Sequence, residues 1–307
     1  MPLPESERSV PSVLLIGASG YIGSRVAHEL RALRWTVVGC DRRGAADQSA
    51  FSRFLAAPYP EIPDEEIAAA DVVLWFAGHS SVKLSQDAPW ESLENNVFDL
   101  ARLFRRVGAA GKPVVYASSA SVLSSAEDQY SLIANEVSAN AYDAGKLAFD
   151  IMAPHFRVAS LGLRLATVSG WSPNMRWDLV FNAMNRSAAV EGVVRVQNSS
   201  SFRSLLFMDD LCTYIQETVT ALAGSTPLEG TRQVVLGSWS GTIGQLAAEI
   251  AAFWGASVQF GQETGTYSFV LNDRELVHTC GGAGAVYKSI GERCTRFAKQ
   301  TGWKVPV

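Results

Sequence analysis

The chain has 307 residues, of which 48% are hydrophobic and 18% are charged, a composition typical of a globular protein with a sizeable core. Its formal net charge of −4 provides no basic surface for nucleic acid, and no apolar run reaches membrane-spanning length. Neither the four histidines nor the four cysteines, Cys40, Cys212, Cys280 and Cys294, show metal-ligand spacing. We therefore expect a soluble cytoplasmic protein with reduced thiols, no metal site and a loose polar tail over residues 1–11.

The first structural signal is an apolar run followed by a glycine-containing turn. Residues 13–16 predict a buried parallel strand, and a helical pattern over residues 24–33 follows the turn. Gly17 and Gly20 allow a tight turn and close approach of a pyrophosphate to the helix N-terminus, and Gly23 allows close packing of helix on strand. The spacing is GxxGxxG rather than GxGxxG, so on its own it also fits a tight turn without a ligand.

The next segment favours a dinucleotide site. A second strand is predicted over residues 36–40, and Asp41 follows it, 24 residues after Gly17. An acid at this position can accept hydrogen bonds from the adenosine ribose and repels a 2′-phosphate, which favours NAD over NADP. Arg42 and Arg43 come next and could instead hold a 2′-phosphate, so NADP stays an alternative.

Strand and helix signals then alternate, which predicts an α/β fold with a doubly wound parallel (Rossmann) sheet. Further strands are expected over residues 71–76, 112–117 and 157–165, and a helix over 92–107. One more strand is expected between residues 44 and 70, where Pro58–Ile62 is only a poor candidate.

The pattern changes after Gly170 to short alternating pieces, which predicts a smaller C-terminal substrate lobe. Its expected strands and helices cover residues 192–196, 204–207, 234–236, 209–222 and 242–254. We expect a dinucleotide-binding domain over residues 12–168, and a mostly substrate-binding lobe over 169–307 from which some segments return to the main sheet.

Two groups of residues are candidates for a catalytic site. Ser118, Ser119 and Ser121 follow a strand that is expected to end at Ala117, so their hydroxyls should emerge at the ligand-binding edge of the sheet. Tyr142 and Lys146 lie four residues apart and share a helix face. Free tyrosine titrates near pH ~10, and a neighbouring ammonium together with a positive nicotinamide ring would lower its pKa toward working pH. Alternatively, the serines are only a polar strand end, and Tyr142 and Lys146 only a solvated helix face. Both alternatives are disfavoured because these residues follow, in this order, a glycine-turn strand and an acidic strand end.

Together these motifs resemble the extended short-chain dehydrogenase/reductase family, in the branch of NAD-dependent sugar-nucleotide epimerases and dehydratases. The resemblance covers residues 13 to about 220 well and the remainder weakly. It also includes Phe76-Ala77-Gly78, Asn95-Asn96-Val97, Leu163-Arg164-Leu165, Arg203 with Asp210-Leu211, and the ending Gly302-Trp303-Lys304-Val305-Pro306.

The resemblance implies roles for individual residues. Tyr142 would be the catalytic base or acid, Ser119 would assist it, and Lys146 would hold the nicotinamide ribose and tune the tyrosine. The implied cofactor-binding residues are Gly17, Ser19, Gly20, Tyr21, Ile22, Gly23, Asp41, Arg42, Ala77, Gly78, Asn96, Ala117, Ser118, Tyr142, Lys146, Thr167 and Val168. The implied substrate-binding residues are Ser80, Ser119, Ser121 and Arg203.

Departures from the family pattern limit the substrate assignment. Dehydratases of this branch typically carry Asp-Glu after the catalytic threonine, whereas this chain has Ala120-Ser121, which disfavours a 4,6-dehydratase because loss of water needs a general acid. Thr167 replaces an asparagine that many epimerases use near the diphosphate. Family members commonly bind the diphosphate with a second, C-terminal arginine, which no motif marks in this chain. The candidates are Arg274, Arg293 and Arg296.

The favoured function is an NAD-dependent epimerase of a sugar nucleotide, in which Tyr142 removes a hydroxyl proton while hydride moves to NAD and later returns to the other face. An NAD(P)H-dependent reductase or dehydrogenase of a keto sugar or similar carbonyl compound would use the same residues and stays open. A non-catalytic dinucleotide sensor is disfavoured by the intact pair of Tyr142 and Lys146.

The family commonly dimerises through a four-helix bundle, which implies a homodimer here. The helix after Asn96 and the helix with Tyr142 carry apolar residues at helical spacing, some of which need a cover beyond the sheet. These residues are Val97, Leu100, Ala101, Phe104 and Val107 in the first helix, and Leu147, Phe149, Ile151 and Met152 in the second. The alternative is that the whole set belongs to the core.

Overall fold

The computed structural model describes residues 10–45, 47–80, 82–123, 140–224, 228–264, 268, 270–271 and 289–306. Residues 1–9 of the expected tail, Cys280 and Arg274 lie outside this part of the chain. Contacts divide the chain into two compact units, Met1–Arg164 with Ile215–Val234, and Leu165–Tyr214 with Val235–Val307.

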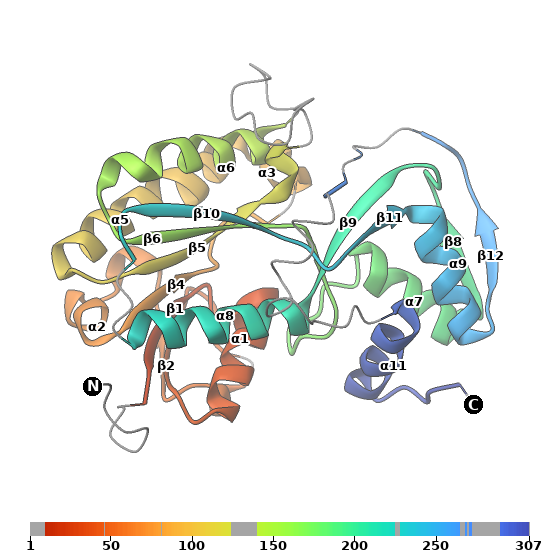
Figure 1. Cartoon of the computed structure of the whole chain (residues 1–307), viewed down its shortest axis with the longest axis horizontal. Coiled ribbons are helices and arrows are strands. Elements are labelled where there is room, and N and C mark those ends of the chain that lie inside the picture. Colours follow the sequence, from red (N-terminus) through yellow and green to blue (C-terminus); the bar gives the residue numbers. More distant parts are fainter. Residues whose placement is uncertain are drawn as a thin grey trace. The chain divides into compact units, whose positions relative to one another are not determined.

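The first unit contains a seven-stranded parallel sheet, which confirms the predicted doubly wound fold (Figure 1). Its strands lie in the order β10 (Thr231–Leu236), β6 (Ser160–Leu165), β5 (Val114–Ser119), β4 (Val72–Trp75), β1 (Ser12–Ile16), β2 (Thr36–Asp41) and β3 (Arg53–Ala56). The chain leaves β1 on one side to form β2 and β3, and returns on the other side as β4. The carboxyl ends of β1 and β4 therefore form a topological switch point, where open α/β sheets bind ligands.

Helices cover both faces of this sheet: α5 and α6 lie on one face, and α1 and α8 on the other (Figure 1). The helices are α1 (Tyr21–Ala32), α2 (Asp64–Ala69), α3 (Val82–Asp87), α4 (Pro89–Leu93), α5 (Asp99–Ala110), α6 (Ala141–Met152) and α8 (Met208–Ala223). Phe104 of α5, Tyr116 of β5 and Phe149 of α6 meet edge to face, with ring centroids 4.9–5.6 Å apart. This aromatic contact fixes α6, which carries Tyr142 and Lys146, against β5.

The strand expected at Pro58–Ile62 is wrong. The structure places the strand earlier, as β3, and forms a 3₁₀ turn over Tyr59–Glu61. Pro58 and Pro60 have no N–H to donate to a strand ladder. β3 is the strand at the edge of this sheet beside β2 and is partly exposed, so it lacks the continuous apolar run of a central strand.

The second unit has its own small sheets and core. β9 (Phe202–Phe207) lies between β7 (Thr167–Ser169) and β11 (Trp239–Thr242), and β8 (Val193–Val196) pairs with β12 (Ser257–Phe260). Its helices are α7 (Val180–Glu191), α9 (Ile243–Trp254) and α11 (Ile290–Thr301). The core contains an aromatic cluster of Trp177, Phe181, Phe207, Phe297 and Trp303. Within the described ranges, no helix has both the length and the apolar character needed to cross a membrane.

Candidate active site

The β1–α1 turn is built so that glycine is required at two positions. Gly17 has a φ of +85°, and a Cβ there would lie 2.4 Å from the backbone nitrogen of Ala77. A Cβ on Gly23 would lie 2.2 Å from the carbonyl oxygen of Gly17. Gly20 precedes α1 and donates its N–H to the same oxygen over 3.0 Å. The close packing predicted for Gly23 is therefore present, and Gly17 additionally brings the turn against the end of β4.

The start of α1 is suited to an anion. Gly20 provides no capping side chain, and the first turn, which includes Tyr21 and Ile22, contains no acidic residue. The N–H groups of a helix N-terminus carry partial positive charge and attract phosphate groups. This end of α1 can therefore accommodate the pyrophosphate of a dinucleotide.

Asp41 is the last residue of β2 and lies against the glycine turn. Its carboxylate accepts hydrogen bonds from the backbone N–H of Ser19 at 3.1 Å and of Arg43 at 3.0 Å. The Ser19 hydroxyl in turn donates to the carbonyls of Arg43 and Gly44. The neighbouring Arg42 is exposed. A carboxylate has about four acceptor positions, so these two bonds leave Asp41 able to accept ribose hydroxyls as well.

A second place where the backbone packs too closely for a side chain lies after β4. Gly78 has a φ of +118°, and a Cβ there would lie 2.3 Å from Oδ1 of Asn96. Asn96 is buried in a π-helical turn, Glu94–Phe98, and donates through Nδ2 to the His79 carbonyl and the Ser92 hydroxyl. Its Oδ1 is buried without a hydrogen-bond partner in the described chain. Such an oxygen favours a donor from water or a ligand at this place, beside Ala77 and the exposed Ser80.

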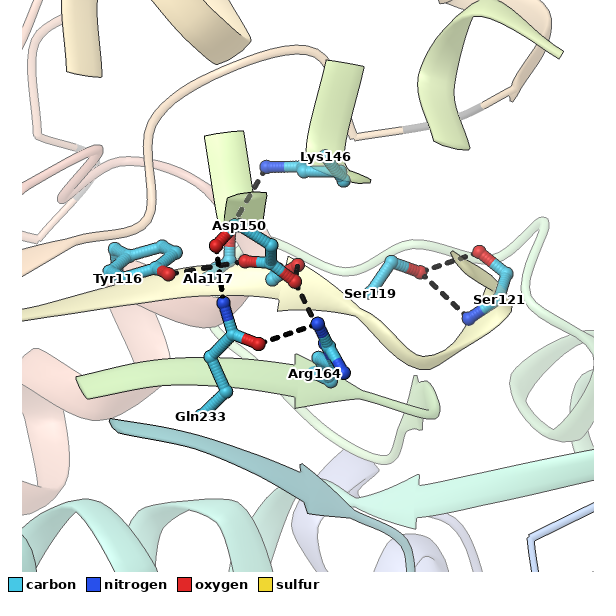
Figure 2. A network of polar contacts seen from close by, with 9 residues as sticks. Tyr116, Ala117, Ser119, Ser121, Lys146, Asp150, Arg164 and Gln233 are labelled. Atoms are coloured by element: carbon cyan, nitrogen blue, oxygen red, sulfur yellow. Dashed lines mark hydrogen bonds and ion pairs between the residues drawn. The ribbon is translucent and has the colours of Figure 1, made fainter. Parts of the chain in front are cut away.

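Tyr142 and Lys146 lie one turn apart on α6, beside the carboxyl end of β5. Lys146 is buried, and its Nζ donates to the Ala117 carbonyl over 3.0 Å (Figure 2). The same Nζ lies 5.9 Å from the centre of the Tyr142 ring. The alternative of a solvated helix face is excluded for Lys146. Burial lowers the pKa of Lys146 to about 8, an effect that the negative charge of Asp150 partly opposes.

A buried polar network around Asp150 joins α6, which carries Tyr142 and Lys146, to the sheet (Figure 2). Asp150 accepts hydrogen bonds from Tyr116 at 3.1 Å, Ser118 at 2.9 Å and Arg164 at 2.8 Å. Gln233 bridges Arg164 and the Asp150 backbone carbonyl. Burial and the Asp150 carboxylate together raise the pKa of Tyr116 well above its usual range, so this phenol stays neutral.

This network corrects one expectation about the serines. The Ser118 hydroxyl does not emerge at the ligand-binding edge but bonds inward to Asp150, because β5 continues to Ser119 and successive side chains of a strand point to opposite faces. Ser119 and Ser121 instead bond to each other, with their hydroxyl oxygens 2.7 Å apart (Figure 2).

Sequence reasoning missed two carboxylates. Asp143 accepts a hydrogen bond from the Ser121 hydroxyl and another from Asn140 at 2.6 Å. The sequence around Asp143 does not reveal this contact, because its partner Ser121 lies 22 residues earlier. Asp150 follows Lys146 by four residues. This spacing places both residues on one helix face and could have identified Asp150 as a neighbour of Lys146.

The remaining predicted residues belong to the second unit. Thr167 and Val168 lie in β7 and pair with Leu205 and Leu206 of β9. Arg203 of β9 is buried, and its Nη1 donates to the Phe202 carbonyl over 2.8 Å.

The two described candidates for a second arginine both form ion pairs. Arg293 binds both carboxylate oxygens of Asp210, at 3.0 and 2.6 Å, and lies 4.5 Å from the Phe207 ring centre. Arg296 pairs with Asp209 at 2.6 Å. In the part of the chain that the structure describes, no group of three His, Cys, Asp or Glu side chains could hold a metal ion.

Comparison with known proteins now identifies the family. The model of the NAD-dependent epimerase/dehydratase family matches residues 13–226. The chain belongs to this family. None of the curated proteins compared with the chain matches it.

Solved structures show the same fold at low sequence identity. MoeE5 in complex with UDP-glucuronic acid and NAD is similar with a TM-score of 0.77 and 23% identity, covering 95% of this chain and 99% of that one. TunA, an NAD-dependent NDP-hexosamine 5,6-dehydratase involved in tunicamycin biosynthesis, gives 0.77 and 20%, covering 95% and 98%. A tyrosine-to-phenylalanine variant of UDP-glucuronic acid 4-epimerase from Bacillus cereus, with a fluorinated substrate analogue and NAD, gives 0.76 and 17%, covering 95% and 99%.

Proposed function

We propose that this protein is an NAD-dependent epimerase of a nucleotide sugar. The observation that carries the proposal is the buried Lys146, held by the Ala117 carbonyl 3.0 Å away, with its charge 5.9 Å from the Tyr142 ring. A cation at this distance stabilises a phenolate, which is the form of tyrosine that can remove a proton from a hydroxyl group.

The first unit has the features that NAD binding requires. The glycine turn and the uncapped start of α1 would hold the pyrophosphate, Asp41 would accept the adenosine ribose hydroxyls, and Lys146 would hold the nicotinamide ribose. When bound there, NAD would supply reversible hydride transfer. The unpaired Oδ1 of Asn96 supports a polar ligand or an ordered water beside Gly78.

The chain's own residues would move the proton and hold the reacting oxygen. Tyr142 removes the proton of a sugar hydroxyl and returns it at the end of the cycle. Ser119 binds the same oxygen and orients it, and Lys146 keeps its position because both its aliphatic stem and its ammonium are enclosed. No net oxidation of the substrate results.

Three further features follow as proposals. MoeE5 and the Bacillus cereus epimerase were solved with UDP sugars, which supports a nucleoside diphosphate sugar as substrate, with Arg203 at its nucleotide. The scattered positions of Cys40, Cys212 and Cys294 in the sequence suit reduced thiols, which supports a reducing compartment such as the cytoplasm. Exposed apolar residues on α4 and α6 support a homodimer.

Incubation of the purified protein with UDP-glucose and with UDP-glucuronic acid tests the activity, with NMR detection of the 4-epimer. We expect conversion without net NADH production, and Tyr142→Phe should lower kcat by at least about 10²-fold, the usual contribution of a positioned acid–base group. NAD affinity of the variant should stay near that of the wild type, because only the phenolic oxygen is lost. Stoichiometric consumption of NADH with a keto sugar would instead show a reductase, and a variant within about tenfold of wild type would exclude Tyr142 as the base.

A further inference from the structure

Lys146 carries its charge in a place that favours the neutral amine. The residue is 6% exposed, and the described hydrogen-bond partner of its ammonium is a neutral group, the Ala117 carbonyl 3.0 Å away. Burial of an ammonium disfavours its protonated form unless an opposite charge lies nearby. If Lys146 is to stay a cation beside Tyr142, a neighbouring negative charge has to oppose the effect of burial.

Asp150 is placed to provide that negative charge. It follows Lys146 by four residues on α6, so the two side chains lie on one helix face. Both side chains reach the same part of β5: Ala117 accepts from Lys146, and the next residue, Ser118, donates to Asp150 over 2.9 Å (Figure 2). Both are buried, where water screens a charge interaction less than at the surface. The Asp150 charge raises the pKa of Lys146, against the larger effect of burial, which lowers it to about 8.

The contacts of Asp150 leave part of its charge uncompensated. Its Oδ2 accepts from Nε of Arg164 over 2.8 Å, whereas Nη2 of Arg164 donates to Oε1 of Gln233 over 2.5 Å. The two parallel bonds of a bidentate arginine–carboxylate pair are therefore not formed between the described side chains. Oδ1 accepts from the Tyr116 hydroxyl, which stays neutral because burial raises its pKa well above the usual range. One oxygen of the carboxylate thus has a neutral partner.

Other charged groups near α6 are exposed or bonded elsewhere. Helix α6 packs against β5, α3, α4 and neighbouring helical turns. Asp143 of α6 is buried, and its oxygens accept from Ser121 and Asn140. The titratable residues that the other elements contribute are exposed to water, apart from Tyr116: Lys83, Asp87, Glu91, Glu94 and His155. Asp150 is therefore the carboxylate whose charge acts on Lys146.

We propose that Asp150 is a positioning residue that keeps Lys146 charged and thereby keeps a cation beside Tyr142. The proposal rests on the proposed function, in which this cation stabilises the phenolate. Arg164 limits the effect, because it neutralises part of the carboxylate's charge. A purely structural role, in which Asp150 only ties α6 to the sheet, would change the stability of the protein but not the protonation of Lys146.

Asp150→Asn removes the charge and keeps the size of the side chain. NMR of protein labelled with ¹³C at lysine Cε follows the protonation of Lys146, and Lys146→Met identifies its signal. In the NAD-loaded protein, titrated from about pH 6 to pH 10, we expect the pKa of Lys146 to fall by about one unit or more in Asp150→Asn, the usual effect of losing one nearby opposite charge. Ser118→Ala is the matched control, because it removes a hydrogen bond to the same carboxylate and leaves its charge. An unchanged pKa in Asp150→Asn, or an equal fall in Ser118→Ala, would overturn the proposal.

Arg164→Met makes the opposite change and keeps the proposal testable if Asp150→Asn does not fold. It removes the cation that pairs with Asp150 and retains the carboxylate, so the pKa of Lys146 should rise. A pKa that falls or stays the same in this variant would contradict the proposed role.

The pH dependence of kcat, with UDP-glucose and UDP-glucuronic acid as probes, gives the functional readout. We expect kcat to decline as Lys146 loses its proton, and the midpoint of this decline to move to lower pH in Asp150→Asn and to higher pH in Arg164→Met. A midpoint that stays in place while the Lys146 signal shifts would refute the positioning role. If wild-type protein turns over neither probe, the proposed function fails, while the NMR titration still decides whether Asp150 keeps Lys146 charged.

Discussion

Asp41 accepts two backbone hydrogen bonds within the protein itself, from Ser19 and Arg43, and this affects how its cofactor role can be tested. Replacing it by alanine removes the ribose acceptor, the charge that repels a 2′-phosphate and the anchor of the turn all at once. Asp41→Asn is the sharper change, because an acceptor oxygen remains while the negative charge is lost.

We expect Asp41→Ala to weaken NAD binding and to raise affinity for NADP relative to NAD, because both the acceptor and the repulsive charge disappear. Asp41→Asn should lose less NAD affinity and still shift the preference toward NADP. Calorimetric titration of each protein with NAD and NADP measures both effects. An unchanged ratio of the two dissociation constants in both variants would show that Asp41 does not face the ribose.

Lys146 gives a prediction about stability and pH. Burial lowers its pKa from 10.5 to about 8, so between these two pH values the folded chain binds fewer protons than the unfolded chain. Stability from this group therefore rises with pH over that range, and below pH ~8 the cost of burying the charge is fully present. Lys146→Met should be more stable than the apo wild type at neutral pH, and the difference in Tm should narrow as pH rises. Thermal unfolding of both proteins from pH 7 to 10 measures this, and a difference independent of pH would contradict it.

At the scale of elements, Asp150 joins α6 to the sheet. It accepts hydrogen bonds from Tyr116 and Ser118 of β5 and from Arg164 of β6, while Gln233 of β10 bonds to its backbone. This buried group therefore helps, together with the aromatic contact of Phe149, to hold Tyr142 and Lys146 of α6 at the end of β5.

Asp150→Ala should destabilise the protein by about 3–5 kcal/mol, because it leaves the buried Arg164 guanidinium without its carboxylate. Glu191→Ala is the matched control: it breaks the exposed pair with Arg195 on α7 and β8 and should cost less than about 1 kcal/mol. Urea unfolding of the three proteins compares the two losses. Equal small losses would show that the network around Asp150 contributes little to stability.

At the scale of the whole molecule, the predicted dimer depends on residues that the fold leaves uncovered. Leu100, Phe104 and Phe149 of the predicted apolar set lie in the core, whereas Ile151 and Met152 of α6 are 49% and 47% exposed. Trp90 of α4, a helix that contacts α6, is 81% exposed. Part of the predicted apolar set therefore lies in the core, whereas Ile151 and Met152 would be buried only by a partner.

We expect a homodimer at micromolar concentration that the double variant Ile151→Asp with Met152→Asp converts to a monomer near the chain mass of 33.1 kDa. Phe260→Asp is the control, because it places the same charge at a 64% exposed apolar residue of the second unit. Sedimentation velocity measures all three proteins. A wild-type protein that sediments as a monomer would refute the dimer.

The sequence by itself determined the fold class and the central strands, and it predicted the place of the candidate site. Each of these leaves a local pattern: a continuous apolar run for a buried strand, a glycine where the backbone turns tightly, and four-residue spacing for Tyr142 and Lys146 on one helix face. Such patterns involve residues close together in the chain, so they can be recognised without knowing the tertiary structure.

Only the tertiary structure decided which polar groups bond to one another. Three examples join residues up to 83 positions apart: the inward bond of Ser118 to Asp150, the hydrogen bonds from Ser119 through Ser121 to Asp143, and the pairing of Arg293 with Asp210. The edge strand β3 depended in the same way on its pairing with β2 rather than on its own composition. Hydrogen-bond partners are chosen by three-dimensional proximity and by the need to satisfy buried polar groups, and neither leaves a periodic signal in the sequence.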